Sequence, residues 1–218
     1  MPEDVGSDAA SCAGRIIWSL WHFQTDTESW GMEDDEQPHL LIGYFLQRQQ
    51  VEELRSRMSD RSGFRDWPRG FRIGQTRLDG ATGMEQGFVD PWDDDAPSAD
   101  PADVLHLPEP TPSGPVSVVW DVWHFKLRDP AAPIEPLSAK GIGLFSSPAN
   151  AAAAVAHRRR QPGFRDWPQG FRIFRRRLGV AFGLDGFRER YGWVAWRDSL
   201  QGQGRSDLVA LPNEDRTP

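Results

Sequence analysis

Cysteine is nearly absent from this sequence. Cys12 is the only one among 218 residues, which excludes an intramolecular disulfide framework and a cysteine-based metal site. The stretch around it has no basic segment followed by an apolar core, and no run in the chain approaches the roughly 18 apolar residues of a membrane span. These absences predict a soluble cytoplasmic protein that does not enter a membrane.

Familiar catalytic signatures are missing as well. The sequence has no Gly-rich phosphate loop, no nucleophile elbow and no zinc-binding helix motif, so we expect no cofactor and no metal. The 21 Gly and 18 Pro stay below the level of a low-complexity chain, and ten Trp with twelve Phe favour packed cores. A length of 218 residues leaves room for two small domains.

An internal duplication organises what is present. The sequence GFRDWPRGFRI at 63–73 returns at 163–173 with one change, from Arg69 to Gln169. Further upstream, WSLWHF at 18–23 matches WDVWHF at 120–125. The chain is therefore predicted to contain two copies of one unit.

Each copy predicts two strands at its start. The apolar runs 16–23 and 118–125 are typical of buried strands, and 40–45 and 141–145 are typical of second short strands. A glycine lies at the centre of each second strand, where it permits a bulge or a close approach of another backbone. The spacing of the two Trp in each first strand places them on opposite faces.

One helix follows the strands in each copy. In the first, Val51, Leu54 and Met58 take the inward positions of an amphipathic helix. In the second, Ser147 and Pro148 start a helix that is expected to run to Arg160.

The repeated stretch is read as a corner that leads into a third strand. Leu78 and Leu178 fall out of the alternation of that strand, so a bulge is expected before each. A closing hook follows, 84–88 in one copy and 184–187 in the other. The predicted fold class is α+β, with two tandem ββαβ-type repeats, each a small sheet with one helix on one face, packed as a pseudo-symmetric pair.

The boundaries follow from composition. Residues 89–114 hold six Pro and seven acidic residues, so they have too few apolar groups to offset the entropy of folding. Residues 191–196 have no equivalent in the first copy and predict an extra strand or a patch that covers the interface between the units. The predicted division is a first unit at 15–90, an acidic Pro-rich linker at 91–114, a second unit at 115–198, and flexible tails at 1–14 and 199–218.

The motifs resemble a small bacterial domain family of unknown function. The resemblance is carried by Trp-His-Phe, Ile-Gly-x-Phe, a helix, Pro-Gly-Phe-Arg-Asp-x-Pro-x-Gly-Phe-x-Ile, and a terminal Glu-x-Gly-Phe, and it covers roughly 150 residues in the two copies. The first copy departs from the pattern at Ser62 and at Leu46–Gln47, and the second has Gly179 where the first has Asp79. The resemblance implies a fold and a bacterial source but no chemistry.

Charge is divided unequally between the halves. Residues 1–114 contain 22 acids and 9 bases, and residues 115–218 contain 10 acids and 16 bases, so the net charges are −13 and +6. One basic surface is predicted for the second unit from Arg158, Arg159, Arg160, Arg172, Arg175, Arg176 and Arg177. It can pair with the acidic first unit or linker, with an acidic protein partner, or with nucleic acid. The overall pI near 5.2 argues against nucleic acid.

The corner has a recognition and a structural interpretation. Trp and Arg are frequent interface anchors, so the candidate binding residues are Arg65, Asp66, Trp67, Arg165, Asp166 and Trp167, together with the arginines of the basic surface. The structural interpretation, which identity of the two copies favours, gives Gly63 and Gly163 a positive φ after the helix and lets Pro68 and Pro168 set a turn. On this interpretation Asp66 and Asp166 bond backbone amides, and the Trp side chains cover the core.

His22 and His124 are the candidates for catalysis. Neither has a Cys, His or carboxylate at metal-ligand spacing, so a buried structural role is expected; His39, His106 and His157 have no counterparts. The predicted function is non-catalytic binding of a protein, in the manner of an immunity protein that blocks a toxin. One alternative is a nucleic-acid-associated protein. The other is an enzyme with a cleft between the units that uses His22 or His124 with Asp79 or Asp185.

Overall fold

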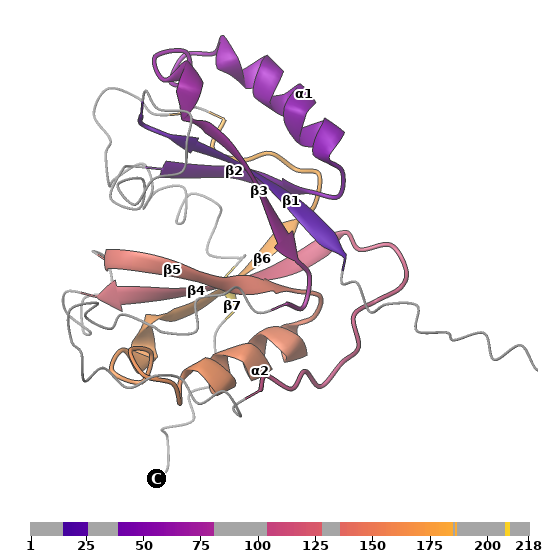
Figure 1. Ribbon diagram of the computed structural model, residues 1–218, viewed down its shortest axis with the longest axis vertical. Coiled ribbons are helices and arrows are strands. Elements are labelled where there is room, and N and C mark those ends of the chain that lie inside the picture. The colour runs from indigo at the N-terminus through magenta and orange to yellow at the C-terminus, as the bar shows by residue number, and fades with distance from the viewer. Residues whose placement is uncertain are drawn as a thin grey trace, which may run out of the picture.

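The computed structural model describes residues 15–25, 39–80, 104–127, 136–184, 186 and 208–209. The protein is α+β, with one sheet and one helix in each half of the chain (Figure 1). The elements are β1 (Ile16–Phe23), β2 (His39–Phe45), α1 (Arg48–Ser59), the 3-10 turn η2 (Pro68–Gly70), β3 (Phe71–Arg77), β4 (Val118–Leu127), β5 (Pro136–Phe145), α2 (Pro148–Arg158), the 3-10 turn η3 (Pro168–Gly170), β6 (Phe171–Arg177) and β7 (Leu208–Val209).

Both sheets are antiparallel and place their first strand at the centre. The strand order is β2-β1-β3 in one and β5-β4-β6-β7 in the other. Leu20 pairs with Ile73 on one side, and Val122 pairs with Ile173 at the corresponding place in the other sheet. The predicted duplication and the α+β class are thus confirmed.

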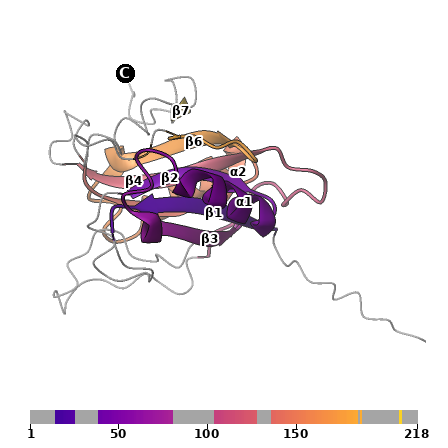
Figure 2. The ribbon, with the colours of Figure 1, turned by 90° about the horizontal axis from the view of Figure 1, so that it is seen from above.

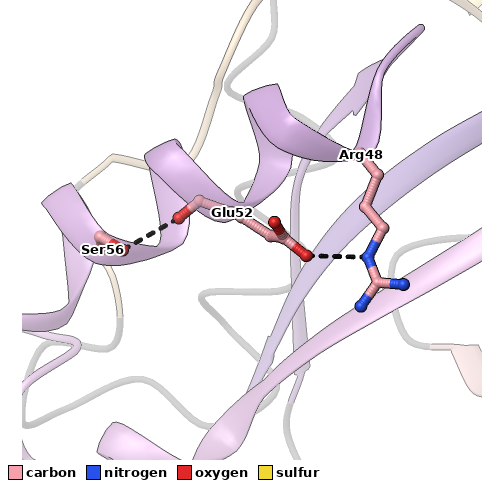
Figure 3. A network of polar contacts seen from close by, with 3 residues as sticks. All are labelled: Arg48, Glu52 and Ser56. Atoms are coloured by element: carbon pink, nitrogen blue, oxygen red, sulfur yellow. Dashed lines mark hydrogen bonds and ion pairs between the residues drawn. The ribbon is translucent and has the colours of Figure 1, made fainter.

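The buried side of α1 is the one that the sequence predicts. Val51, Leu54 and Met58 are the buried residues of α1, as predicted from their spacing. On its exposed side Arg48 Nε lies 2.8 Å from Glu52 Oε1, and Ser56 Oγ donates to the Glu52 carbonyl oxygen at 3.0 Å (Figure 3). This exposed pair adds little stability.

The start of α2 is capped as predicted. The Ser147 hydroxyl accepts a hydrogen bond from the Asn150 amide at 3.1 Å, and Pro148 occupies the first helical position. The helix ends at Arg158, two residues earlier than expected.

The central glycines of β2 and β5 serve both of the predicted purposes. The register of β1 with β2 skips Ile42, so a bulge lies beside Gly43, and the pairing of β4 with β5 skips Ile142 beside Gly143. A Cβ on Gly43 would lie 2.8 Å from the Val180 carbonyl oxygen. The bulge expected before Leu78 is wrong, because β3 keeps a continuous register with β1 from residue 71 to residue 77.

Helices and sheets form four layers, helix, sheet, sheet and helix (Figure 1). One core lies between each helix and its own sheet, and its fully buried side chains include Phe64 in the first half and Phe145, Phe164 and Phe171 in the second. A third core lies between the two sheets, and its buried members are Ile17, Leu41, Tyr44, Leu78, Val116, Val119 and Leu144. Trp18 packs on the helix side of β1 and Trp21 on the inter-sheet side, as the strand period predicts.

The ends of β3 and β6 cross to the opposite sheet. The Asp79 amide donates to the Leu144 carbonyl oxygen at 2.8 Å, and the Gly179 amide donates to the Tyr44 carbonyl oxygen at 2.8 Å. Beyond Gly179, the Phe182 amide donates to the Ile42 carbonyl oxygen at 2.7 Å. Each half therefore extends the outer edge of the other half's sheet.

Two segments outside the predicted units also contribute. Leu105 and Leu107, from the predicted linker, pack against the core of the second unit. β7 comes from the predicted C-terminal tail, and its two residues pair with β6 instead of fraying. The first hook at 84–88 and the segment 191–196 lie outside the described residues, as do Asp185 and Phe187 of the second hook.

Candidate functional site

The repeated corner is buried on its inner side. Gly63 has φ 87° and Gly163 has φ 73°, in the left-handed region that only glycine adopts freely. The next residues, Phe64 and Phe164, are fully buried. Gly63 thus ends the turn after α1 so that Phe64 can enter the core, and Gly163 does the same after α2.

A histidine lies beneath each corner. The His22 ring lies 5.0 Å from the Phe64 ring and 4.4 Å from the Phe71 ring, and His124 has the same distances to Phe164 and Phe171. Nε2 of His22 lies 2.8 Å from the Trp67 carbonyl oxygen, and Nε2 of His124 lies 2.9 Å from that of Trp167. Since a carbonyl only accepts, each Nε2 carries a proton and donates it.

Burial decides the charge of these histidines. Desolvation lowers the pKa of His22 and of His124 from 6.5 to about 4, although the hydrogen bond to the carbonyl acts in the opposite direction. Arg72 lowers the pKa of His22 further, and Lys140 lowers that of His124. Both rings are therefore neutral at pH 7 and hold the corner in place.

A second glycine and an arginine complete the inner side. A Cβ on Gly70 would overlap the Phe23 carbonyl oxygen, and a Cβ on Gly170 would overlap that of Phe125. Arg72 Nη1 donates to the Arg69 carbonyl oxygen at 2.6 Å, and Arg172 Nη1 donates to that of Gln169 at 2.5 Å. The structural interpretation of the glycines thus has a steric basis in both copies.

The outer side of the corner has a different character. Arg65 and Asp66 have side chains that are 66% and 67% exposed, and Arg65 Nε lies 3.8 Å from Asp66 Oδ1. The side chains of Arg165 and Asp166 are 60% and 62% exposed, and Arg165 Nε lies 3.7 Å from Asp166 Oδ1. Burial in the core therefore does not account for the identity of these four residues in the two copies.

Each corner also exposes an aromatic ring beside a proline. Trp67 and Trp167 are half-buried, and Pro68 and Pro168 are exposed. The Lys126 ammonium lies 5.8 Å from the centre of the Trp167 ring, a cation–π contact. The two corners precede η2 and η3 and lie on the left in Figures 1 and 2, one in the upper and one in the lower half of the molecule in Figure 1.

The arginines of the predicted basic surface do not all reach the surface. Arg158 is 4% exposed, donates to Gln161 Oε1 at 2.6 Å and lies over the Phe164 ring. Arg176 is 3% exposed and pairs with Asp121. The exposed members are Arg160, Arg175 and Arg177, while Arg159 and Arg172 are half-buried. The basic surface therefore has fewer exposed arginines than predicted.

A buried polar network between the sheets was missed by sequence reasoning. Asp121 accepts hydrogen bonds from the Tyr44 hydroxyl at 2.9 Å and from Trp123 Nε1 at 2.8 Å, and Arg176 Nε lies 3.7 Å from its Oδ2. Burial raises the pKa of Asp121, and Arg176 opposes that shift. Burial and the neighbouring Asp121 also raise the pKa of Tyr44 well above its usual value.

The residues at the corresponding positions of the repeat carry no charge. Ser19 takes the place of Asp121, and its hydroxyl accepts from Trp21 Nε1 at 3.0 Å. Leu144 takes the place of Tyr44, and Thr76 that of Arg176. The network that joins Tyr44 of the first half to Asp121 and Arg176 of the second therefore has no charged counterpart at these positions.

The enzyme alternative named Asp79 and Asp185 as the carboxylates that would act with a histidine. Asp79 Oδ1 accepts hydrogen bonds from the Ser146 amide at 2.9 Å and from Asn150 Nδ2 at 3.1 Å, so it serves the start of α2. Asp185 lies outside the described residues. Among those described, no group of three His, Cys, Asp or Glu is placed to hold a metal. Within the same ranges no helix is long and apolar enough to cross a membrane.

Comparisons of the chain with protein-family models, with curated proteins and with solved structures gave no match.

Proposed function

We propose that the protein binds a protein partner without catalysis, through the exposed Arg-Asp-Trp-Pro residues of its two corners. The observation that carries the proposal is the division of the repeated stretch into two sides. Packing explains Gly63, Phe64, Gly70 and Phe71 and their counterparts, because each is buried. It does not explain Arg65 and Asp66, which both copies retain with side chains that are at least 60% exposed.

The residue types on the outer side suit recognition. Trp and Arg are the side chains that most often dominate the energy of a protein interface, because they combine a large contact area with hydrogen-bond donors. The two corners lie on the same side of the molecule, one in each half, so a partner that contacts both must extend across the two sheets. We further propose that the two units are related by a pseudo-twofold axis, since their crossing hydrogen bonds join equivalent residues, Asp79 with Leu144 and Gly179 with Tyr44.

The class of partner follows from charge. The exposed Arg160, Arg175 and Arg177 add positive charge to the second unit, and an acidic protein such as a toxin bound by an immunity protein would complement them. Membership of the bacterial domain family that the motifs resemble stays a prediction.

The test is affinity capture from the native host with the full chain as bait. The corner variant carries Arg65→Ala and Arg165→Ala, which remove exposed side chains and leave the core intact. The matched control carries Arg55→Ala and Arg57→Ala on the exposed side of α1. We expect a partner that the wild type and the control retain and the corner variant loses. Equal recovery of that partner by all three proteins would remove the corners from the proposal.

A further inference from the structure

The outer strand edges of the two sheets are covered unequally. The outer edge of β2 pairs with the segment after β6, and that of β5 pairs with Leu78 and Asp79. The outer edge of β6 pairs with β7. Within the described ranges, no strand pairs with the outer edge of β3. Figure 2 shows β3 and β6 at opposite margins of the molecule, with β7 beyond β6.

The pairing of β7 shows what such an edge accepts. Leu208 and Val209 run antiparallel to β6, with Val209 opposite Ile173 and Leu208 opposite Phe174. The Leu178 amide donates to the Ser117 carbonyl oxygen at 2.9 Å, toward β4. Because backbone groups alternate between the two sides of a strand, Ile173 then points its N–H and C=O outward. Val209 is therefore the residue that exchanges hydrogen bonds with Ile173.

The edge of β3 has the same orientation. The Leu78 amide donates to the Arg15 carbonyl oxygen at 2.7 Å, toward β1. By the same alternation Ile73 and Gln75 point their backbone groups away from β1. The two edges differ at three positions, because Gly74, Gln75 and Thr76 lie where β6 has Phe174, Arg175 and Arg176. An incoming residue opposite Gly74 therefore meets no side chain on its neighbour in β3.

We propose that the outer edge of β3 binds an extended segment of a partner protein that carries two consecutive apolar residues. The segment adds as an antiparallel strand, in the register that Leu208 and Val209 adopt on β6. Its second apolar residue lies opposite Ile73 and on the same face, next to the core beneath α1 that Ile73 packs against. Its first lies opposite Gly74, which has no side chain to contact it.

The test uses the full chain and a synthetic peptide with the sequence of residues 205–212. We expect the peptide to shift the Ile73 and Gln75 amide signals saturably in NMR spectra and to slow their hydrogen exchange at least about tenfold. Two modified peptides provide the control. N-methylation at the position of Val209 removes the N–H that pairs with Ile73 and abolishes the response, whereas N-methylation at the position of Leu208 leaves it.

Two protein variants locate the site. Gln75→Pro removes an outward N–H from β3 without touching its hydrogen bonds to β1, and we expect it to abolish the response. Arg175→Pro makes the same change in β6 and should leave the response of β3 intact. The proposal is overturned by unchanged Ile73 and Gln75 amides, by a response confined to β6, or by one that survives Gln75→Pro. Concentration-dependent pairing of the full chain through β3 without peptide would also overturn it, since the occupant would then be a second copy.

Discussion

The contact of Asp79 with the start of α2 offers a quantitative test of how the two halves hold together. Asp79 has φ 57°, and its carboxylate accepts from the Ser146 amide and from Asn150 Nδ2. At the equivalent place in the other half, Gly179 has φ 76° and no carboxylate, and Gln47 provides no side-chain cap for α1. The chain thus has this contact once, and its counterpart serves as a control.

Three substitutions separate the contributions of the cap, the backbone strain and the charge at position 79. Asp79→Ala keeps a Cβ on the left-handed residue, as in the wild type, and removes a charge-assisted cap, which should cost about 2 kcal/mol. Asp79→Gly removes the same cap but relieves the left-handed strain of a residue with a Cβ, about 1 kcal/mol, so its net cost should be about 1 kcal/mol. Asp79→Asn retains an acceptor oxygen and loses the charge, so about 1 kcal/mol is expected.

Gly179→Ala measures the strain alone, because a Cβ there meets nothing within 4 Å. Its cost should equal the difference between the Ala and Gly variants at position 79. The free energy of unfolding is measured by urea denaturation of the full chain, with an unchanged m-value as the sign that the folded and unfolded states stay comparable. If Asp79→Ala were as stable as the wild type, the proposed inter-half cap would contribute nothing.

Three further predictions concern the corners and the buried network. Gly70→Ala should cost about 3 kcal/mol or more in thermal or urea unfolding, since the new Cβ overlaps the Phe23 carbonyl oxygen; a stable variant would contradict the close approach. For His22 and His124 the folded pKa is about 4 and the unfolded pKa about 6.5, so stability is fully present above pH 6.5 and falls as the pH drops toward 4. At pH 5 each histidine should lower the free energy of unfolding by about 2 kcal/mol relative to neutral pH. His22→Gln should remove half of this loss. A pH-independent difference between wild type and variant would argue against neutral buried rings. Tyr44→Phe leaves Asp121 without one hydrogen bond and should cost about 2 kcal/mol in the same assay, whereas no loss would mean that the carboxylate is satisfied without it.

Local patterns carried most of what the sequence predicted correctly. The spacing of Val51, Leu54 and Met58 identified the buried side of α1, and Ser147 identified the start of α2. These features depend on residues within one or two turns of each other, which a single sequence displays directly. The central glycines of β2 and β5 were also read correctly, because few other features explain a glycine within a strand.

Contacts between the halves were not predictable in the same way. Leu78 falls out of the alternation of β3 because it crosses to pair with Leu144, not because of a bulge. A two-residue contact between distant parts of the chain leaves no periodic pattern. The period of two places Arg176 on the same face as Arg172 and Phe174, but only the packing of the second sheet shows that this face is buried.

The exposed part of the corner was predictable only in part. Its identity in both copies was visible, yet the sequence did not separate the residues kept for folding from those kept at the surface. That separation needed the positions of Phe23 and Phe125, whose carbonyl oxygens exclude a side chain at Gly70 and Gly170.

The crossing of β3 and β6 bears on what would happen if the chain were cut between its halves. Neither half has a complete sheet edge by itself, because Gly179 and Phe182 bind to β2 and Asp79 binds to β5. A protease that cleaved a peptide bond within 91–100 would therefore release no free domain. The two fragments should stay together as a non-covalent heterodimer, elute as one species, and melt in a single cooperative transition.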